Sequence, residues 1–168
     1  MQQLLILRHA KAVPWSPDKE DFPRKLSTAG MQHAQNLAGW ICTHFDLPDH
    51  ILCSPSQRTR ETLAPLLSMV PQLETVTHFI PQIYHSDSPT LESLLDAAFA
   101  EFDRVMIVGH NPGLEWLVRD VIHPKHHEEF TRLPTGTLAA IEFESGWAQG
   151  HDRGHLLHFI RGKKLSTD

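Results

Sequence analysis

The sequence predicts an α/β fold of three layers, in which helices cover both faces of a doubly wound, mostly parallel sheet. Short apolar runs that suit buried strands alternate with stretches of helical periodicity through the first two thirds of the chain. The last third instead holds two strand-like runs, which predict an antiparallel C-terminal pair. The sequence shows no repeats, linkers or low-complexity tracts, so we expect residues 1–168 to form a single domain.

The first half of the chain predicts two strands and two helices. Residues 3–7 are an apolar run typical of a buried strand, and the proline-rich residues 13–23 predict an irregular surface segment of the kind that covers a pocket. Ser27 then has the character of an N-cap, and apolar residues follow it at helical spacing: Met31, Ala34, Leu37, Ala38 and Ile41. Residues 50–53 predict a second strand, and residues 59–69 a helix that Pro65 should kink or end early.

The second half continues this alternation. Residues 73–80 predict a third strand, and residues 89–102 carry apolar side chains at helical intervals. The run at 104–108 is rich in Val, Ile and Met and predicts another buried strand, followed by a Gly-flanked turn and a helix through Val121. Residues 137–144 and 155–161 predict the antiparallel pair, with residues 146–154 between them.

Composition limits the classes of function. The chain has 15 Lys and Arg against 20 Asp and Glu, a formal net charge of -5, so it lacks the positive field of a nucleic-acid-binding protein. The apolar run near the N-terminus is too short for a secretory signal or a membrane span, so we expect a cytoplasmic protein without a membrane partner. Cys42 and Cys53 lie in apolar stretches and are expected to be buried thiols.

Polar clusters follow the predicted parallel strands. Arg8 and His9 come after the first, Ser54 to Arg58 after the second, and Gly109 with His110 after the strand at 104–108. In an open α/β sheet, ligands bind at the carboxyl ends of the strands, where the strand order reverses. We therefore expect these clusters to share one edge of the sheet.

The residue types in these clusters suit phosphoryl transfer. Arg8 and Arg58 can bind phosphate oxygens through a bidentate fork, which lysine cannot reproduce. His9 can act as a nucleophile once its other ring nitrogen is fixed by an acceptor, and His110 can donate a hydrogen bond to a phosphoryl oxygen. Built-in cations mean that no metal or other cofactor is required. Either cluster alone would be read as a surface Arg-His pair or a helix cap, but their joint placement favours a site.

Several motifs resemble the histidine phosphatase superfamily, the phosphoglycerate mutase-like proteins, and specifically its small phosphohistidine phosphatases of the SixA type. These are Leu7-Arg8-His9-Ala10, Ser54-Pro55-x-x-Arg58, Gly109-His110-Asn111-Pro112-Gly113, Arg24-Lys25-Leu26-Ser27 with Gly30, and Leu133-Pro134-Thr135-Gly136. The resemblance spans nearly the whole chain. It implies a covalent phosphohistidine at His9, a phosphate pocket of Arg8, Arg58 and His110, and Arg24 near the substrate. Ser16 and Asn111 are further candidates for substrate binding.

Two positions depart from the family pattern. Ala10 replaces the glycine of the usual R-H-G, a small change that should leave room for phosphate. Gln82 stands where many relatives have the glutamate of P-E-L, and an amide cannot donate a proton as a carboxylic acid does. Asp87 could substitute for that acid, although Asp-Ser-Pro before a helix is more simply an N-terminal turn.

These features predict a metal-independent hydrolase, most simply a phosphatase acting on phosphohistidine in a phosphorelay protein or a similar phosphoprotein. Phosphoramidates need less help from an acid than alkyl phosphates, so the glutamine at position 82 fits such a substrate. The alternatives are a catalytically weak phospho-ligand binding module and a phosphomonoesterase acting on small phosphorylated metabolites. A mutase would need the acid and a larger insertion. The histidines at 123, 126 and 127 match no zinc template and are expected to lie in a solvated loop.

Overall fold

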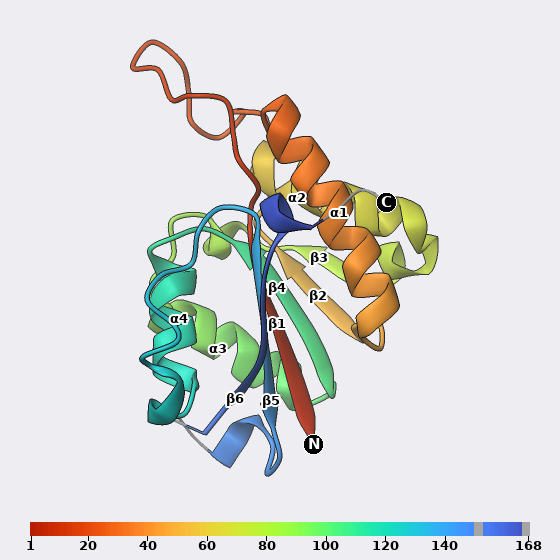
Figure 1. The fold of residues 1–168 in the computed structure, drawn as a ribbon, viewed down its shortest axis with the longest axis vertical. Coiled ribbons are helices and arrows are strands. Elements are labelled where there is room, and N and C mark those ends of the chain that lie inside the picture. The colour runs from red at the N-terminus through yellow and green to blue at the C-terminus, as the bar shows by residue number, and fades with distance from the viewer. Residues whose placement is uncertain (150–152, 166–168) are drawn as a thin grey trace.

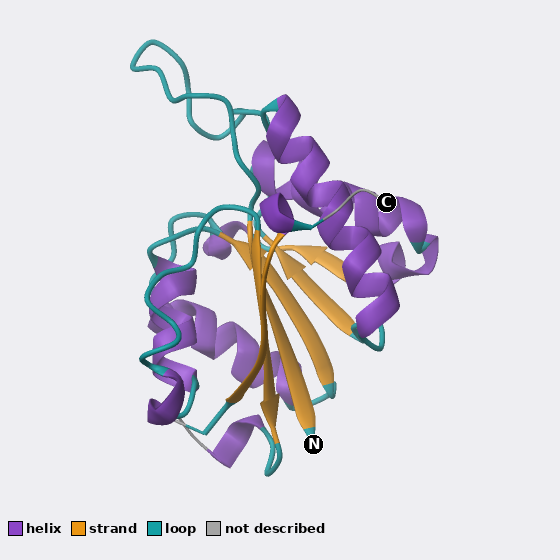
Figure 2. Ribbon diagram, viewed as in Figure 1, coloured by secondary structure: helices purple, strands orange, loops and turns teal. Residues whose placement is uncertain are grey.

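The computed structural model describes residues 1–149 and 153–165, which form one six-stranded sheet between two layers of helices (Figures 1 and 2). β1 pairs in parallel with β4, β4 with β2, and β2 with β3, whereas β5 is antiparallel to both β1 and β6. This confirms the predicted three-layer α/β fold with an antiparallel C-terminal pair. In spatial order the strands are β3 (Thr77–Phe79), β2 (His50–Cys53), β4 (Arg104–Gly109), β1 (Gln2–Arg8), β5 (Thr137–Phe143) and β6 (His155–Arg161).

Both faces of the sheet are buried, which explains why the strands read as continuous apolar runs. Leu4 and Ile6 of β1 pack in one core with α3 (Ser88–Phe99) and α4 (Gly113–Val121). The intervening Leu5 and Leu7 pack in a second core with α1 (Thr28–His44) and α2 (Gln57–Met69). Neighbouring side chains of a strand point to opposite faces, so β1, β2, β4 and β5 each contribute to both cores. Figure 2 shows the two helical layers on either side of the strands.

Helix α1 begins as predicted and differs in one residue of its buried face. The Ser27 hydroxyl accepts a hydrogen bond from the Gly30 amide at 3.0 Å, as an N-cap does. Met31, expected in the apolar face, is 57% exposed. Gly30 takes the buried position of that first turn, because a Cβ there would lie 2.0 Å from the carbonyl oxygen of Lys11. The helix therefore packs directly on the backbone that follows the first strand.

Of the kink or early end expected at Pro65, the early end is wrong. Helix α2 starts after its N-cap Ser56 and continues through Pro65 to Met69. A proline inside a helix removes one backbone hydrogen bond, but Leu63 and Leu66 are buried on either side of it. Packing of this apolar face holds the helix where the local rule alone would end it.

The third strand is shorter than the predicted residues 73–80. Pro71 opens a short 3-10 helix (Pro71–Val76), and only Thr77–Phe79 pairs with β2. Leu73 is buried within that turn. Proline favours the first position of a helical turn, so the chain closes its apolar contact there before it reaches the edge of the sheet.

Asp87 caps a helix as predicted, and of the two cysteines expected to be buried only Cys53 is fully so. Asp87 is the N-cap of α3 and accepts a hydrogen bond from the Thr90 amide at 2.9 Å, which confirms the N-terminal turn. Cys53 is buried, and burial raises the pKa of its thiol to about 12, whereas Cys42 is only partly buried.

Part of the predicted connection at 146–154, namely 150–152, lies outside the described residues. No helix within the described ranges is long and apolar enough to cross a membrane.

Candidate active site

The polar clusters predicted to converge do lie at one edge of the sheet. Strands β2, β4 and β1 are neighbours, and all three run in parallel. Ser54, His110 and His9 directly follow these strands, so they emerge side by side at the carboxyl ends, at the top of the sheet in Figure 1. We call Arg8, His9, Ser54, Arg58 and His110 the floor of the site.

The floor holds His9 in one tautomer. Its Nδ1 lies 2.8 Å from the carbonyl oxygen of Ala10, and because a carbonyl only accepts, Nδ1 carries the proton and Nε2 keeps a free electron pair. The Ala10 amide donates to the Thr62 hydroxyl at 2.9 Å, and the Gly136 amide donates to the His9 carbonyl at 2.8 Å. Ala10 is fully buried and does not have a positive φ, so this site does not require the family's glycine.

The same surroundings keep His9 uncharged. His9 is only 6% exposed. Desolvation, together with the charges of Arg58, Arg8 and Arg24, lowers its pKa to about 4. The imidazole is therefore neutral and nucleophilic over the whole neutral range.

His110 lies next to His9, with ring centroids 5.3 Å apart. Its Nδ1 is 3.3 Å from Arg58 Nη2, which only donates, so Nδ1 accepts and Nε2 donates to the Ser54 hydroxyl at 2.8 Å. Burial first, and then the Arg58 charge, lower the pKa of His110 to about 3. Both ring nitrogens are engaged, so a phosphoryl oxygen would reach His110 only by replacing Ser54 or Arg58.

The two floor arginines present buried donors. Arg58 is 4% exposed and gives hydrogen bonds of 3.0 Å from Nη1 to the Asp21 carbonyl and from Nη2 to the Asp21 carboxylate. Arg8 donates from Nη1 to the Leu133 carbonyl at 3.0 Å. The Nε of each arginine is buried with no hydrogen-bond partner among the described residues. Such orphan charged donors are costly unless an anion satisfies them.

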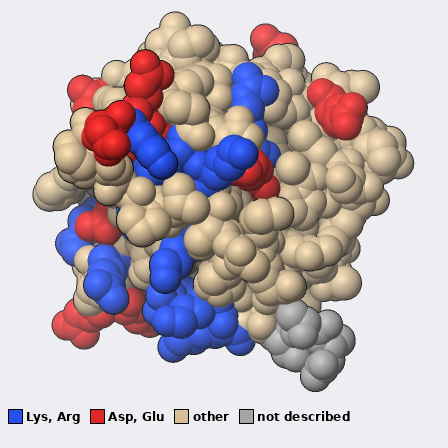
Figure 3. Space-filling view, turned by 90° about the horizontal axis from the view of Figure 1, so that it is seen from above, with Lys and Arg blue, Asp and Glu red and all other residues tan. Residues whose placement is uncertain are grey.

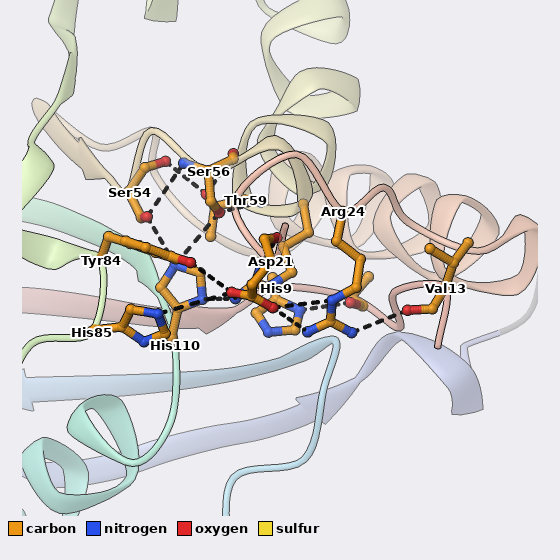
Figure 4. Close-up of polar contacts among 12 residues, drawn as sticks. His9, Val13, Asp21, Arg24, Ser54, Ser56, Thr59, Tyr84, His85 and His110 are labelled. Carbon is orange, nitrogen blue, oxygen red and sulfur yellow. Dashed lines mark hydrogen bonds and ion pairs between the residues drawn. The ribbon is translucent and has the colours of Figure 1, made fainter. Parts of the chain in front are cut away.

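Asp21 is a functional residue that no sequence pattern indicated. Its carboxylate accepts from Arg24 Nε at 3.2 Å and Nη2 at 3.1 Å, from Arg58 Nη2 and, at 2.6 Å, from the Tyr84 hydroxyl (Figure 4). Partial burial raises its pKa, but the Tyr84 hydrogen bond and the Arg58 charge outweigh this and hold it at about 2. The carboxylate thus links Arg24, at the outside, to Arg58 on the floor.

Tyr84 and His85 complete the outer boundary and were likewise not expected from the sequence. Their rings are 3.9 Å apart between centroids, and those of Tyr84 and His110 are 5.4 Å apart. The turn that carries them is held against α4, because a Cβ at Gly113 would lie 2.4 Å from the carbonyl oxygen of Ser86. We call Asp21, Arg24, Tyr84 and His85 the rim; its members come from irregular segments, so no periodicity in the sequence marks them.

The remaining candidates lie in different places. Asn111 donates to the Leu133 carbonyl at 2.7 Å and thus braces the same turn as Arg8. Ser16 lies with Arg24 in the wall of a separate surface pocket of about 600 Å³ and hydrogen-bonds to Asp18. Gln82 is exposed on a short 3-10 helix (Pro81–Ile83). Their roles toward a substrate remain predictions.

The histidines at 123, 126 and 127 lie away from the floor, near the C-terminal strand, with His123 and His155 ring centroids 6.5 Å apart. Across the described ranges, no group of three or more His, Cys, Asp or Glu side chains is placed to hold a metal ion. Figure 3, seen from above, shows Lys and Arg gathered on the left and centre of this face, with Asp and Glu among them.

Comparison with known proteins gives the relatives of the chain. No protein-family profile matches it. Among curated sequences, an uncharacterised Mycobacterium leprae protein is 26% identical over 149 residues, which are 84% of this chain and 89% of that protein. An uncharacterised chloroplastic protein of Arabidopsis thaliana is 33% identical over 122 residues, 68% of this chain and 56% of that protein. The names of these relatives assign no activity.

Solved structures are more informative. A candidate phosphohistidine phosphatase SixA from Agrobacterium tumefaciens is 30% identical, with a TM-score of 0.81 over 95% of this chain and 97% of that one. The protein histidine phosphatase SixA complexed with tungstate is 21% identical, with a TM-score of 0.78 over 96% and 97% of the two chains. A candidate alpha-ribazole-5'-phosphate phosphatase from Escherichia coli has a TM-score of 0.65 at 17% identity over 99% of each chain, which shows a common fold.

Proposed function

Because this chain belongs to the histidine phosphatase superfamily, with SixA-type proteins as its structural neighbours, we propose that it is a phosphatase whose nucleophile is His9 Nε2. The hydrogen bond from His9 Nδ1 to the Ala10 carbonyl carries this proposal, because it leaves Nε2 unprotonated and fixed. The low pKa of His9 supports it, since no proton has to be removed before attack at neutral pH.

The mechanism follows from the floor. The phosphoryl group of the substrate binds at the donors of Arg8 and Arg58, including their unpartnered Nε groups. His9 Nε2 attacks phosphorus, and the bond to the leaving group breaks on the opposite side. The guanidinium groups stabilise the charge on the equatorial oxygens. Water then attacks the phosphohistidine, and the electron pair of the broken P–N bond returns to Nε2.

We propose phosphohistidine in a protein as the substrate class. Gln82 is exposed and cannot act as an acid, and Asp87 is engaged as the cap of α3. A phosphoramidate can be protonated on its leaving nitrogen before attack, so it depends less on an acid from the enzyme. The metal-independent character expected from the sequence is part of the same proposal, because arginine side chains provide the positive charge.

Trapping of the intermediate tests this function. The purified chain is mixed with a protein carrying labelled phosphohistidine and quenched during turnover. We expect acid-labile, alkali-stable label on the chain, lost in His9→Ala and retained in the matched surface variant His78→Ala. Equal hydrolysis by His9→Ala and the unmodified chain would exclude the mechanism. Calorimetric binding of phosphopeptide with no hydrolysis of any activated substrate would instead indicate a binding module.

A further inference from the structure

In the proposed reaction, a poor leaving group must take up a proton as its bond to phosphorus breaks. Neither of the candidates from the sequence, Gln82 and Asp87, is placed to donate that proton. The nucleophile and its neighbours are buried, with His9 and His110 each 6% exposed. In an in-line displacement the leaving group departs on the side opposite the nucleophile. A proton donor must therefore lie toward the open side of the floor.

His85 lies on that side. Its side chain is 66% exposed, while its Nε2 is 3.9 Å from the Asp21 carboxylate, which also binds Arg58 on the floor. Its ring is 6.4 Å from that of His110 between centroids (Figure 4). A distance of 3.9 Å is too long for a hydrogen bond, so the carboxylate does not hold the N–H of His85. The N–H is thus free to turn toward a ligand.

His85 also has an unusual backbone conformation. Its φ is +56°, and it is the one non-glycine residue with positive φ in the described part of the chain. A left-handed conformation is unfavourable for a residue with a side chain, and such strain clusters at functional sites. In this conformation the imidazole of His85 lies against the Tyr84 ring, with its Nε2 3.9 Å from the Asp21 carboxylate (Figure 4).

We propose that His85 is the proton donor to the leaving group, with the ionised Asp21 as its positioning residue. This inference rests on the proposed function. The charged and titratable groups that face His85 are Asp21, Tyr84 and His110. The Tyr84 hydroxyl is committed to Asp21, and His110 to Ser54 and Arg58. Unlike these neighbours, the His85 imidazole combines an exposed side chain with an N–H that is not held in a hydrogen bond.

The proton balance closes over the two steps. As His9 Nε2 forms its bond to phosphorus, the bond from phosphorus to the leaving atom breaks, and that atom takes the proton of the His85 imidazolium. Water then attacks the phosphohistidine, the P–N bond breaks, and the proton released by water returns to His85. The enzyme ends in its starting state, with the leaving group and inorganic phosphate as products.

A leaving-group series tests the inference in the full chain. Values of kcat/KM are measured for phenyl phosphates ranging from the para-nitro compound to unsubstituted phenyl phosphate. The variant is His85→Asn, because asparagine also tolerates a left-handed backbone and should keep the turn. The variant should slow the unsubstituted compound about 100-fold and the para-nitro compound less than about threefold. In Asp21→Asn, the ratio of kcat/KM for the para-nitro compound to that for the unsubstituted compound should change in the same direction but by less. In the surface variant His78→Asn this ratio should not change.

Each outcome is decisive. Loss of kcat/KM by one common factor for all compounds would give His85 a structural role, and no change would give it none; either result overturns the inference while leaving His9 as nucleophile. Absence of turnover by the unmodified chain on every compound, together with no label on His9, would overturn the proposed function and this inference with it.

Discussion

The floor and the rim of the active site are built in different ways. Floor residues follow strands or lie in the first turn of a helix, and His9, Ser54, Arg58 and His110 are all buried. Rim residues come from irregular segments, and the side chains of Arg24 and Asp21 are 22% and 25% exposed. In the proposed mechanism, the sheet thus fixes the nucleophile and the phosphate-binding groups in position, while irregular segments supply the more exposed groups around them.

The largest expected effect is on the floor. His9→Ala should lower kcat/KM by at least about a thousandfold, because it removes the only group placed to form the covalent intermediate in the proposed mechanism. Steady-state assays with a phosphoramidate measure this, and circular dichroism checks the fold. A variant retaining a tenth of the activity would mean that the floor lacks the role given to it.

The floor should also make the fold sensitive to acid. His9 and His110 have folded pKa values of about 4 and about 3, below the roughly 6.5 of unfolded histidine. Between these values the unfolded chain binds more protons, so the free energy of unfolding falls as pH decreases below about 6.5, by up to ~1.4 kcal/mol per pH unit for each group. Urea denaturation at pH 7.5 and 5 measures this. His110→Asn should weaken this pH dependence. The rim residue Asp21 has a pKa of about 2, so its contribution to the free energy of unfolding is lost only at lower pH.

The arginines allow a direct test of floor against rim. Arg58→Lys should lower kcat/KM about 100-fold, since lysine cannot reproduce a buried guanidinium that binds Asp21 and His110 together. Arg24→Lys at the rim should cost less than about tenfold. Equal losses in the two variants would remove the distinction between the two regions.

Hydroxyl groups should show a smaller contrast, in stability. Ser54→Ala leaves the buried Nε2 proton of His110 with only the distant Ser56 hydroxyl, at 3.5 Å, and should lower the free energy of unfolding by about 1–3 kcal/mol. Tyr84→Phe should cost about 1 kcal/mol or less, because water can reach the Asp21 carboxylate. Thermal or chemical denaturation compares the two; a larger cost for Tyr84→Phe would contradict the order.

The smallest effect concerns Asp87. As an N-cap it should contribute about 1 kcal/mol to stability, which Asp87→Ala loses and Asp87→Asn keeps. Neither change should alter kcat/KM for any leaving group. A selective loss with poor leaving groups in Asp87→Asn would instead identify it as the missing acid.

The strand pattern could predict the floor, whereas Arg24 was the one rim residue expected, and only from the family resemblance. Strand periodicity, together with the polar residues that end each strand, is enough to predict that Arg8, His9 and His110 meet at one edge of the sheet. The rim depends on the path of residues 13–23 and on one left-handed residue, His85, which no periodic pattern encodes. Pro65 and Met31 show the related limit: packing across the fold decided their positions, against local propensity.

The position of β1 has a consequence for folding. Gln3 pairs with Arg104, and Leu5 lies between Met106 on one side and Ala140 on the other, so the first strand made waits for neighbours that are far along the chain. During synthesis, this apolar strand stays unpaired until more than half of the chain has emerged. Such non-local pairing slows folding and leaves an unpaired, aggregation-prone strand edge exposed. Nascent or truncated chains that end before β4 should therefore depend most on chaperones, and the nucleophile, although translated first, becomes chemically competent only when the sheet closes around it.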